Sequence, residues 1–337
     1  MQNTELKAVE LSADIIQHLP NVIYFFSDHS RMCCFNANNQ QCYPRFNIFS
    51  SCEDLIRGQT IKVISWGVAS YTTLINVAAA LLIITNRKKC IKHKSFAMTL
   101  AISDAVTAAC FLSLCIADGK FHGEFGLIAD QWRESFMCNF IEFSMFVSSN
   151  ISLVSLMCYA IFTTKSITQL TIQKSRGIVL PIVISAILIL LGLSRQITLY
   201  MYDHDVHNYF CFPFTFSPTE STIVFALQWL SITFNLLIIC ISIISYAYLF
   251  RFLLSVSKNV TIGKRVTKSF SKKKIATMLA MYIIISMFSF TPSLITQSLV
   301  LMNVMIDPNI FFFIVIVTVP LNTALDPIFF IFPNLGS

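Results

Sequence analysis

Seven long apolar stretches follow one another along the chain, separated by segments rich in charged or turn-forming residues. Each approaches or exceeds the roughly 20 residues that a helix needs to cross the hydrocarbon core of a bilayer. They cover residues 62–85, 96–117, 137–162, 177–200, 222–250, 275–302 and 308–333. The pattern predicts an all-α membrane protein, a bundle of seven transmembrane helices with its two ends on opposite sides.

The composition agrees with this prediction. Of the 337 residues, 55% are hydrophobic and 12% are charged, and this charged share is about half that of a soluble globular chain. A soluble fold is therefore excluded as the interpretation of the whole chain.

Basic residues fix the expected orientation in the membrane. The connections 86–95, 163–176 and 251–274 carry 16 of the 24 Lys and Arg residues and contain no Asp or Glu. Because such connections stay in the cytosol, we expect an extracellular amino terminus and a cytoplasmic carboxyl terminus. The sequon at Asn259 then lies inside the cell and should carry no glycan. The net charge of +7 is a topology signal, and no nucleic-acid partner is expected.

Six cysteines fall in segments that this orientation places outside the cell. An even number in an oxidising compartment permits three disulfides, with connectivity that the spacing leaves open. The six are Cys33, Cys34, Cys42, Cys52, Cys138 and Cys211.

Two aspartates, Asp104 and Asp326, interrupt the second and seventh spans. Asn76, Ser152 and Asn322 add neutral polar groups to neighbouring spans. Two carboxylates in a low-dielectric bundle repel, so either one is protonated or a cation such as Na⁺ sits at Asp104 between them. A water-filled hydrogen-bond network that only holds the helices together explains these residues equally well.

Prolines inside the spans permit kinks. Pro292 and Pro327 lie closest to the polar residues and suit a switch that rotates half-helices, although a static bend is the commoner outcome.

Several motifs resemble those of rhodopsin-like G-protein-coupled receptors with a leucine-rich-repeat ectodomain. Asn76, LAISD (100–104) and PLNTALDPIFF (320–330) are similar to first-, second- and seventh-helix patterns of that superfamily. The cysteine-rich stretch 33–55 and NYFCFPF (208–214) resemble the hinge and second outer loop of the repeat-containing branch. The stretch 120–135 is most similar to the relaxin-receptor subgroup.

The resemblance implies a domain order and a function. Residues 1–32 would be the remnant of a last repeat, 33–61 a cysteine-rich hinge, and 62–333 the bundle. The chain would be a multi-pass receptor of the plasma membrane for an extracellular peptide or protein hormone that signals to heterotrimeric G proteins, and not an enzyme. No protein cofactor is expected beyond a possible Na⁺ at Asp104.

The resemblance also implies roles for individual residues, which remain expectations here. Cys138 and Cys211 would form the family's disulfide. Ligand contacts would come from Glu53, Asp54, Trp132, Phe212 and Pro213. The switch would involve Phe290, Pro292, Pro327 and Phe330. The G protein would face Thr163, Thr164, Tyr246 and Lys272.

Departures from the family pattern keep other functions open. Phe162-Thr163-Thr164 stands where an acidic residue, a basic residue and an aromatic residue are expected, which favours a non-coupling decoy or partner of intact receptors. An ion transporter using Asp104 and Asp326 is a weaker alternative, because the spans show no internal repeat. The basic stretch 257–274 suits a G protein or, equally, anionic lipid of the inner leaflet.

Overall fold

The computed structural model describes most of the predicted bundle. The described residues are 24–26, 41–43, 52–85, 94–168, 179–202, 211–213, 222–259, 284–285, 287–302, 304, 310 and 313–328.

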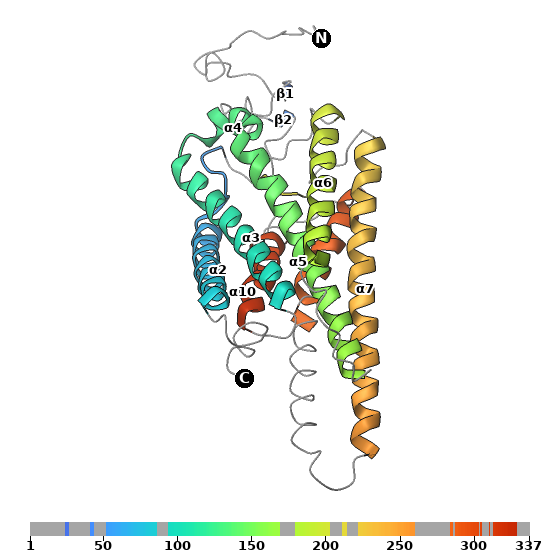
Figure 1. The fold of residues 1–337 in the computed structure, drawn as a ribbon. Helices are drawn as coiled ribbons and strands as arrows, with labels where there is room; N and C mark the ends of the chain where they lie inside the picture. The colour runs from blue at the N-terminus through green and yellow to red at the C-terminus, as the bar shows by residue number, and fades with distance from the viewer. Residues whose placement is uncertain are drawn as a thin grey trace.

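Five long helices coincide with the first five predicted spans (Figure 1). They are α2 (Gln59–Thr85), α3 (Lys94–Lys120), α5 (Phe136–Thr168), α6 (Val179–Tyr202) and α7 (Thr222–Asn259). All five are long and apolar enough to cross a membrane. Most extend beyond the predicted ends because a helix continues into the interface once its apolar part is formed. α7 is the longest, at about 57 Å for a rise of 1.5 Å per residue.

The sixth and seventh predicted spans are described in part. Met287–Leu301 is a shorter apolar helix in the sixth. In the seventh, a π-helix η2 (Ile314–Thr318) leads into α10 (Val319–Asp326), with Pro320 at its start and Pro327 at its end. Because the ring nitrogen of Pro320 cannot donate, the helical ladder is interrupted there. The prediction of a helical membrane bundle is confirmed.

α5 is the central helix of the bundle. It packs against α3, α6 and α7, while α2 packs against α3 and α10 (Figure 1). The hydroxyls of Thr107 and Ser148 lie 2.7 Å apart and join α3 to α5. A Cβ at Gly192 would lie 2.5 Å from Cγ2 of Val147, so glycine is what permits α6 to approach α5 this closely.

One helix was not expected. The stretch 120–135 reads as a loop by its charges, but α4 (Phe125–Glu134) forms within it. Phe125, Ala129 and Trp132 are buried at positions i, i+4 and i+7, so this short helix presents one apolar stripe to the bundle.

A small parallel sheet precedes the bundle. β1 (Tyr24–Phe26) pairs with β2 (Gln41–Tyr43), with Phe25 opposite Cys42. One strand lies in the predicted repeat remnant and the other in the predicted hinge. The domain limits at 32 and 61 remain predictions, although α2 begins at Gln59, slightly before the expected start of the bundle.

Candidate functional site

The segment 52–58, which leads into α2, is inserted into the end of the bundle and is called the hinge segment below. Leu55 and Ile56 are 0% and 1% exposed, so both side chains are fully removed from solvent. Burial of two such side chains contributes about 3–6 kcal/mol. They belong to one apolar cluster with residues of α3, α4, α5, η2 and the segment 211–213. Its larger members are Phe111, Leu114, Phe125, Trp132, Ile141, Phe212 and Ile316.

Backbone hydrogen bonds hold the hinge segment against the connection between α3 and α4. The amide of Gly123 donates to the carbonyl of Glu53 at 2.7 Å, and the amide of Gly126 donates to that of Cys52 at 2.7 Å. Gly123 has φ +85°, a conformation that residues with a Cβ rarely adopt. Cys52 is itself disulfide-bonded, to a cysteine whose side chain lies outside the described part of the chain.

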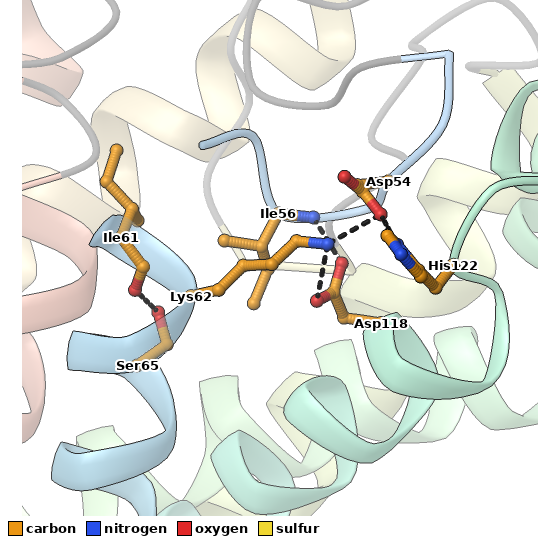
Figure 2. A network of polar contacts seen from close by, with 7 residues as sticks. All are labelled: Asp54, Ile56, Ile61, Lys62, Ser65, Asp118 and His122. Carbon is orange, nitrogen blue, oxygen red and sulfur yellow. Dashed lines mark hydrogen bonds and ion pairs between the residues drawn. The ribbon is translucent and has the colours of Figure 1, made fainter. Parts of the chain in front are cut away.

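Four side chains form a polar clamp around this contact (Figure 2). The backbone amide of Ile56 donates to Oδ1 of Asp118 at 2.7 Å. The Nζ atom of Lys62 lies 2.5 Å from Oδ1 of Asp54 and 3.5 Å from Oδ2 of Asp118. Nδ1 of His122 lies 2.5 Å from the same Asp54 oxygen. The clamp, defined as Asp54, Lys62, Asp118 and His122, therefore joins the hinge segment to α2 and to the end of α3.

The environment of the clamp keeps Asp54 ionised. Burial alone would raise the pKa of Asp54, but the Lys62 ammonium and the His122 ring hold the pKa of this carboxyl below its usual range. The side chains of Lys62 and Asp118 are 12% and 2% exposed, whereas that of His122 is 68% exposed. Lys62 is thus a half-buried cation shared by two carboxylates, with an exposed histidine at the edge.

Two of the residues expected to contact ligand lie in the apolar cluster instead of on its surface. Trp132 is 6% exposed and meets Phe121 edge-on, with ring centroids 5.2 Å apart. Phe212 is 1% exposed and meets Phe111 edge-on at 6.4 Å. Both rings therefore pack in the same buried cluster as Leu55 and Ile56, and a ligand would reach them only if this cluster opened.

Two anchors fix the segment 211–213 over the bundle. The disulfide between Cys138 and Cys211 is formed, as the resemblance implied. In addition, Nη2 of Arg195 donates to the carbonyl of Pro213 at 3.0 Å, while its Nη1 lies 3.2 Å from Oε1 of Glu142. Arg195 of α6 therefore ties this segment to α5 independently of the disulfide.

The predicted polar residues inside the bundle do come together. Nδ2 of Asn76 donates to the carbonyl of Thr323 at 2.8 Å, which links α2 to α10. The Asp104 carboxyl lies beside Asp326 and Ser152. Nδ2 of Asn322 donates to Oδ2 of Asp326 at 3.0 Å. The five residues thus form one network across α2, α3, α5 and α10.

The network has the donor atoms that a hard cation prefers. Among the described residues, Oδ1 of Asn76 and Oδ2 of Asp104 are buried without a hydrogen-bond partner. Buried oxygens of this kind require a proton donor or a metal ion. Carboxylate, amide and hydroxyl oxygens fit a hard cation such as Na⁺. The residues therefore fit the ion that the sequence suggested, and a shared proton would satisfy them as well.

The opposite end of the bundle holds two of the residues expected to face a G protein. Thr164 is buried and its hydroxyl donates to the carbonyl of Ser245 in α7 at 3.3 Å. Tyr246 is half-buried and stacks on Phe250 with centroids 6.2 Å apart. Of Thr163 only the backbone, within α5, is described.

The remaining predicted residues divide into placed and undescribed ones. Phe290 packs against the apolar cluster of α5, α6 and α7, Pro292 is half-buried, and Pro327 is buried. Glu53 is exposed. Five predicted residues have side chains that the structure does not describe: Cys33, Cys34, Cys42, Lys272 and Phe330.

Sequence reasoning missed most of the clamp. Lys62, Asp118 and His122 were not selected, although a basic residue just inside one apolar span and an acidic residue just after the next are a usable signal. Charges at the adjoining ends of antiparallel helices lie at the same depth and can pair. The same reasoning would have found Arg195 and Glu142, which occupy the adjoining ends of α5 and α6.

The curated proteins to which this chain is similar are receptors, and no protein-family model matches it. It is 22% identical over 326 residues to the G-protein coupled receptor GRL101 of Lymnaea stagnalis, covering 94% of this chain and 28% of that protein. It is 22% identical to relaxin receptor 2 of Canis lupus familiaris, and the match covers 95% of this chain and 44% of that protein. It is 25% identical to relaxin receptor 1 of Rattus norvegicus, and the match covers 93% of this chain and 42% of that protein. The chain therefore spans less than half the length of these relatives.

Proposed function

We propose that this chain, a homologue of G-protein-coupled receptors of the relaxin-receptor branch, is the membrane part of a receptor for an extracellular peptide or protein hormone. The observation that carries the proposal is the inserted hinge segment. Its Leu55 and Ile56 side chains share one core with α3, α4 and α5, so the segment cannot move without repacking the bundle.

The hinge segment would act as the input of the receptor. A hormone bound to the part of the protein that precedes it would displace or tighten the segment. Because packed cores are bistable, that movement would select between two arrangements of the helices. A heterotrimeric G protein would read the arrangement at the opposite end, near Thr164 and Tyr246.

The internal polar network would be the element with two states. Asp104 and Asp326 repel when both are ionised, so a single proton or Na⁺ between them favours the arrangement in which they are close. The ion would supply only this charge balance. Asn76 would report the same state to α2 through its bond to Thr323.

The orientation follows from the basic connections and supports the same proposal. The hinge segment, the end of α3 and the disulfide of Cys138 lie together at one end of the bundle, which we assign to the outside. The connection after α7 would then be cytosolic. A glycan found on Asn259 in expressed protein would contradict this assignment.

Second-messenger output in cells tests the proposed function. The resemblance implies that the docked hinge segment favours the active arrangement, so Asp118→Ala, which removes the acceptor of the Ile56 amide, should lower basal output. Glu124→Ala is the matched control, because Glu124 is an exposed acid of the same connection. If the Asp118→Ala protein reaches the cell surface and its basal output is unchanged, the proposed role of the hinge segment is contradicted.

A second candidate is a receptor-like protein that does not couple to G proteins. Two observations favour it: Thr163 stands where the family has a basic residue, and the Thr164 hydroxyl is occupied by α7. Introducing Thr163→Arg separates the candidates. Output from the unmodified chain rules out the non-coupling protein, whereas output that appears only with Thr163→Arg supports it.

A further inference from the structure

A small polar cavity lies beside Pro213, between α6, α7 and the helix Met287–Leu301. Its volume is about 20 Å³. A volume of roughly 10–15 Å³ is enough for one water molecule, so the cavity admits a ligand of that size and no larger one. Its described lining shares no residue with the clamp or with the network around Asp104. Four polar side chains line it: Arg195, Gln228, Ser231 and Gln297.

Gln228 carries the argument, because both ends of its amide need a partner. Its Oε1 and Nε2 atoms are fully buried, and neither has a hydrogen-bond partner in the part of the chain that the structure describes. A side-chain amide can donate two hydrogen bonds and accept others, and burying it with none disfavours the folded state. A water molecule can accept from Nε2 or donate to Oε1. The surroundings of Gln228 therefore call for a small ligand with both donor and acceptor character.

The other polar groups around the cavity complete a water site. Arg195 has five N–H groups, of which the contacts to Glu142 and Pro213 use two. Nε2 of Gln297 donates to Oγ of Ser293 at 3.1 Å, and its second N–H group and its carbonyl oxygen remain. A buried water typically makes about three hydrogen bonds, which these side chains can supply. Because the charge of Arg195 is paired with Glu142, the site needs no ion.

We propose that this cavity binds a water molecule through Gln228, and that the water joins Arg195 and the segment 211–213 to the helix Met287–Leu301. Apolar contacts place α7 against this helix, since Ile232 packs in one buried cluster with Leu294 and Leu301. The water adds a polar contact nearly as strong as a direct hydrogen bond. One consequence rests on the proposed function: a movement of the segment 211–213 would reach the helix that contains Pro292 through this water.

Radiolytic footprinting of the full chain in lipid nanodiscs tests the site. X-rays convert bound water into hydroxyl radicals, which oxidise the side chains next to it, and mass spectrometry locates the oxidised residues. Ile232 and Leu301 line the cavity but are only 2% and 6% exposed. Leu294 is also 6% exposed and belongs to the same apolar cluster, but it is not among the described residues that line the cavity. Ile232 and Leu301 should be oxidised several-fold more than Leu294.

The variant Gln228→Leu distinguishes a water site from a dry cavity. Oxidation of Ile232 and Leu301 should fall to the level of Leu294, because the water loses its anchor. Thermal stability should fall as well, whereas in a dry cavity the removal of an unpartnered buried amide would raise it. Gln131→Leu, the same exchange at an exposed position of α4, should change neither measurement.

Two results would overturn the water site. One is equal oxidation of Leu301 and Leu294 in the unmodified chain, and the other is a Gln228→Leu protein that is more stable than the unmodified chain. Neither measurement depends on signalling, so either result leaves the proposed function standing. Second-messenger output tests the proposed function separately, and the failure of one proposal is thus distinguishable from the failure of the other.

Discussion

Replacing the shared cation of the clamp should release the hinge segment. Lys62→Met keeps most of the length and apolar stem of the side chain but leaves the carboxylates of Asp54 and Asp118 facing one another. Removing one partner of a buried ion pair costs about 3–5 kcal/mol. The Lys62 and Asp54 side chains retain 12% and 15% exposure, so we expect a smaller loss, about 2–3 kcal/mol.

Trypsin reports this loss directly. Arg57 is exposed and follows Ile56 immediately, but the docked hinge segment cannot enter a protease active site. When opening is fast relative to cleavage, the cleavage rate follows the undocked fraction. A loss of about 2–3 kcal/mol then accelerates appearance of the fragment beginning at Gly58 by about 30- to 150-fold.

Two further variants make the reasoning refutable. Lys120→Met removes the same charge from an exposed position of α3 and should change the rate less than about 2-fold. Adding Asp118→Asn to Lys62→Met removes one of the two opposing carboxylates and should recover a large part of the loss. A Lys62→Met rate within 3-fold of the unmodified chain, or a double variant that opens more easily than the single one, would refute the shared-cation account.

Three other predictions concern separate features. Gly123→Ala meets no atom within 4 Å but must keep φ +85°, so it should weaken docking by about 1–2 kcal/mol, measured by the same cleavage assay. Asp104→Asn should abolish any difference in thermal stability between Na⁺ and choline buffers; a difference that persists would place the ion elsewhere. Arg195→Lys loses the planar fork that bonds Pro213 and Glu142 together and should speed reduction of the Cys138 disulfide several-fold, measured by thiol alkylation.

The spans were predictable from the sequence because a bilayer leaves few alternatives. A backbone in hydrocarbon must bond internally, so an apolar stretch of sufficient length becomes a helix. Asn76, Asp104 and Asp326 were predictable for a related reason: polar groups in lipid turn inward and find one another. The disulfide of Cys138 and Cys211 came from the family resemblance and not from the spacing of the cysteines.

The contacts at the two ends of the bundle were harder to predict because they depend on the relative placement of chain segments. α4 was not predicted because its ten residues carry three charges that obscure a stripe of three apolar residues. The pairing of Lys62 with Asp118 depends on which turn of α2 lies beside which turn of α3. Burial of Thr164 against α7 depends on the angle between α5 and α7, which no residue pattern encodes by itself.

The connection between the hinge segment and α2 has almost no slack. Only Arg57 and Gly58 separate Ile56 from the first residue of the helix, and the amide of Lys62 already donates to Gly58 at 3.0 Å. From Lys62, α2 runs as one stiff rod to Asn76, about 21 Å further on at 1.5 Å per residue. The Asn76 side chain donates a hydrogen bond to the carbonyl of Thr323 in the seventh span. A push or pull on the hinge segment would thus arrive at mid-membrane depth as an axial displacement of this rod.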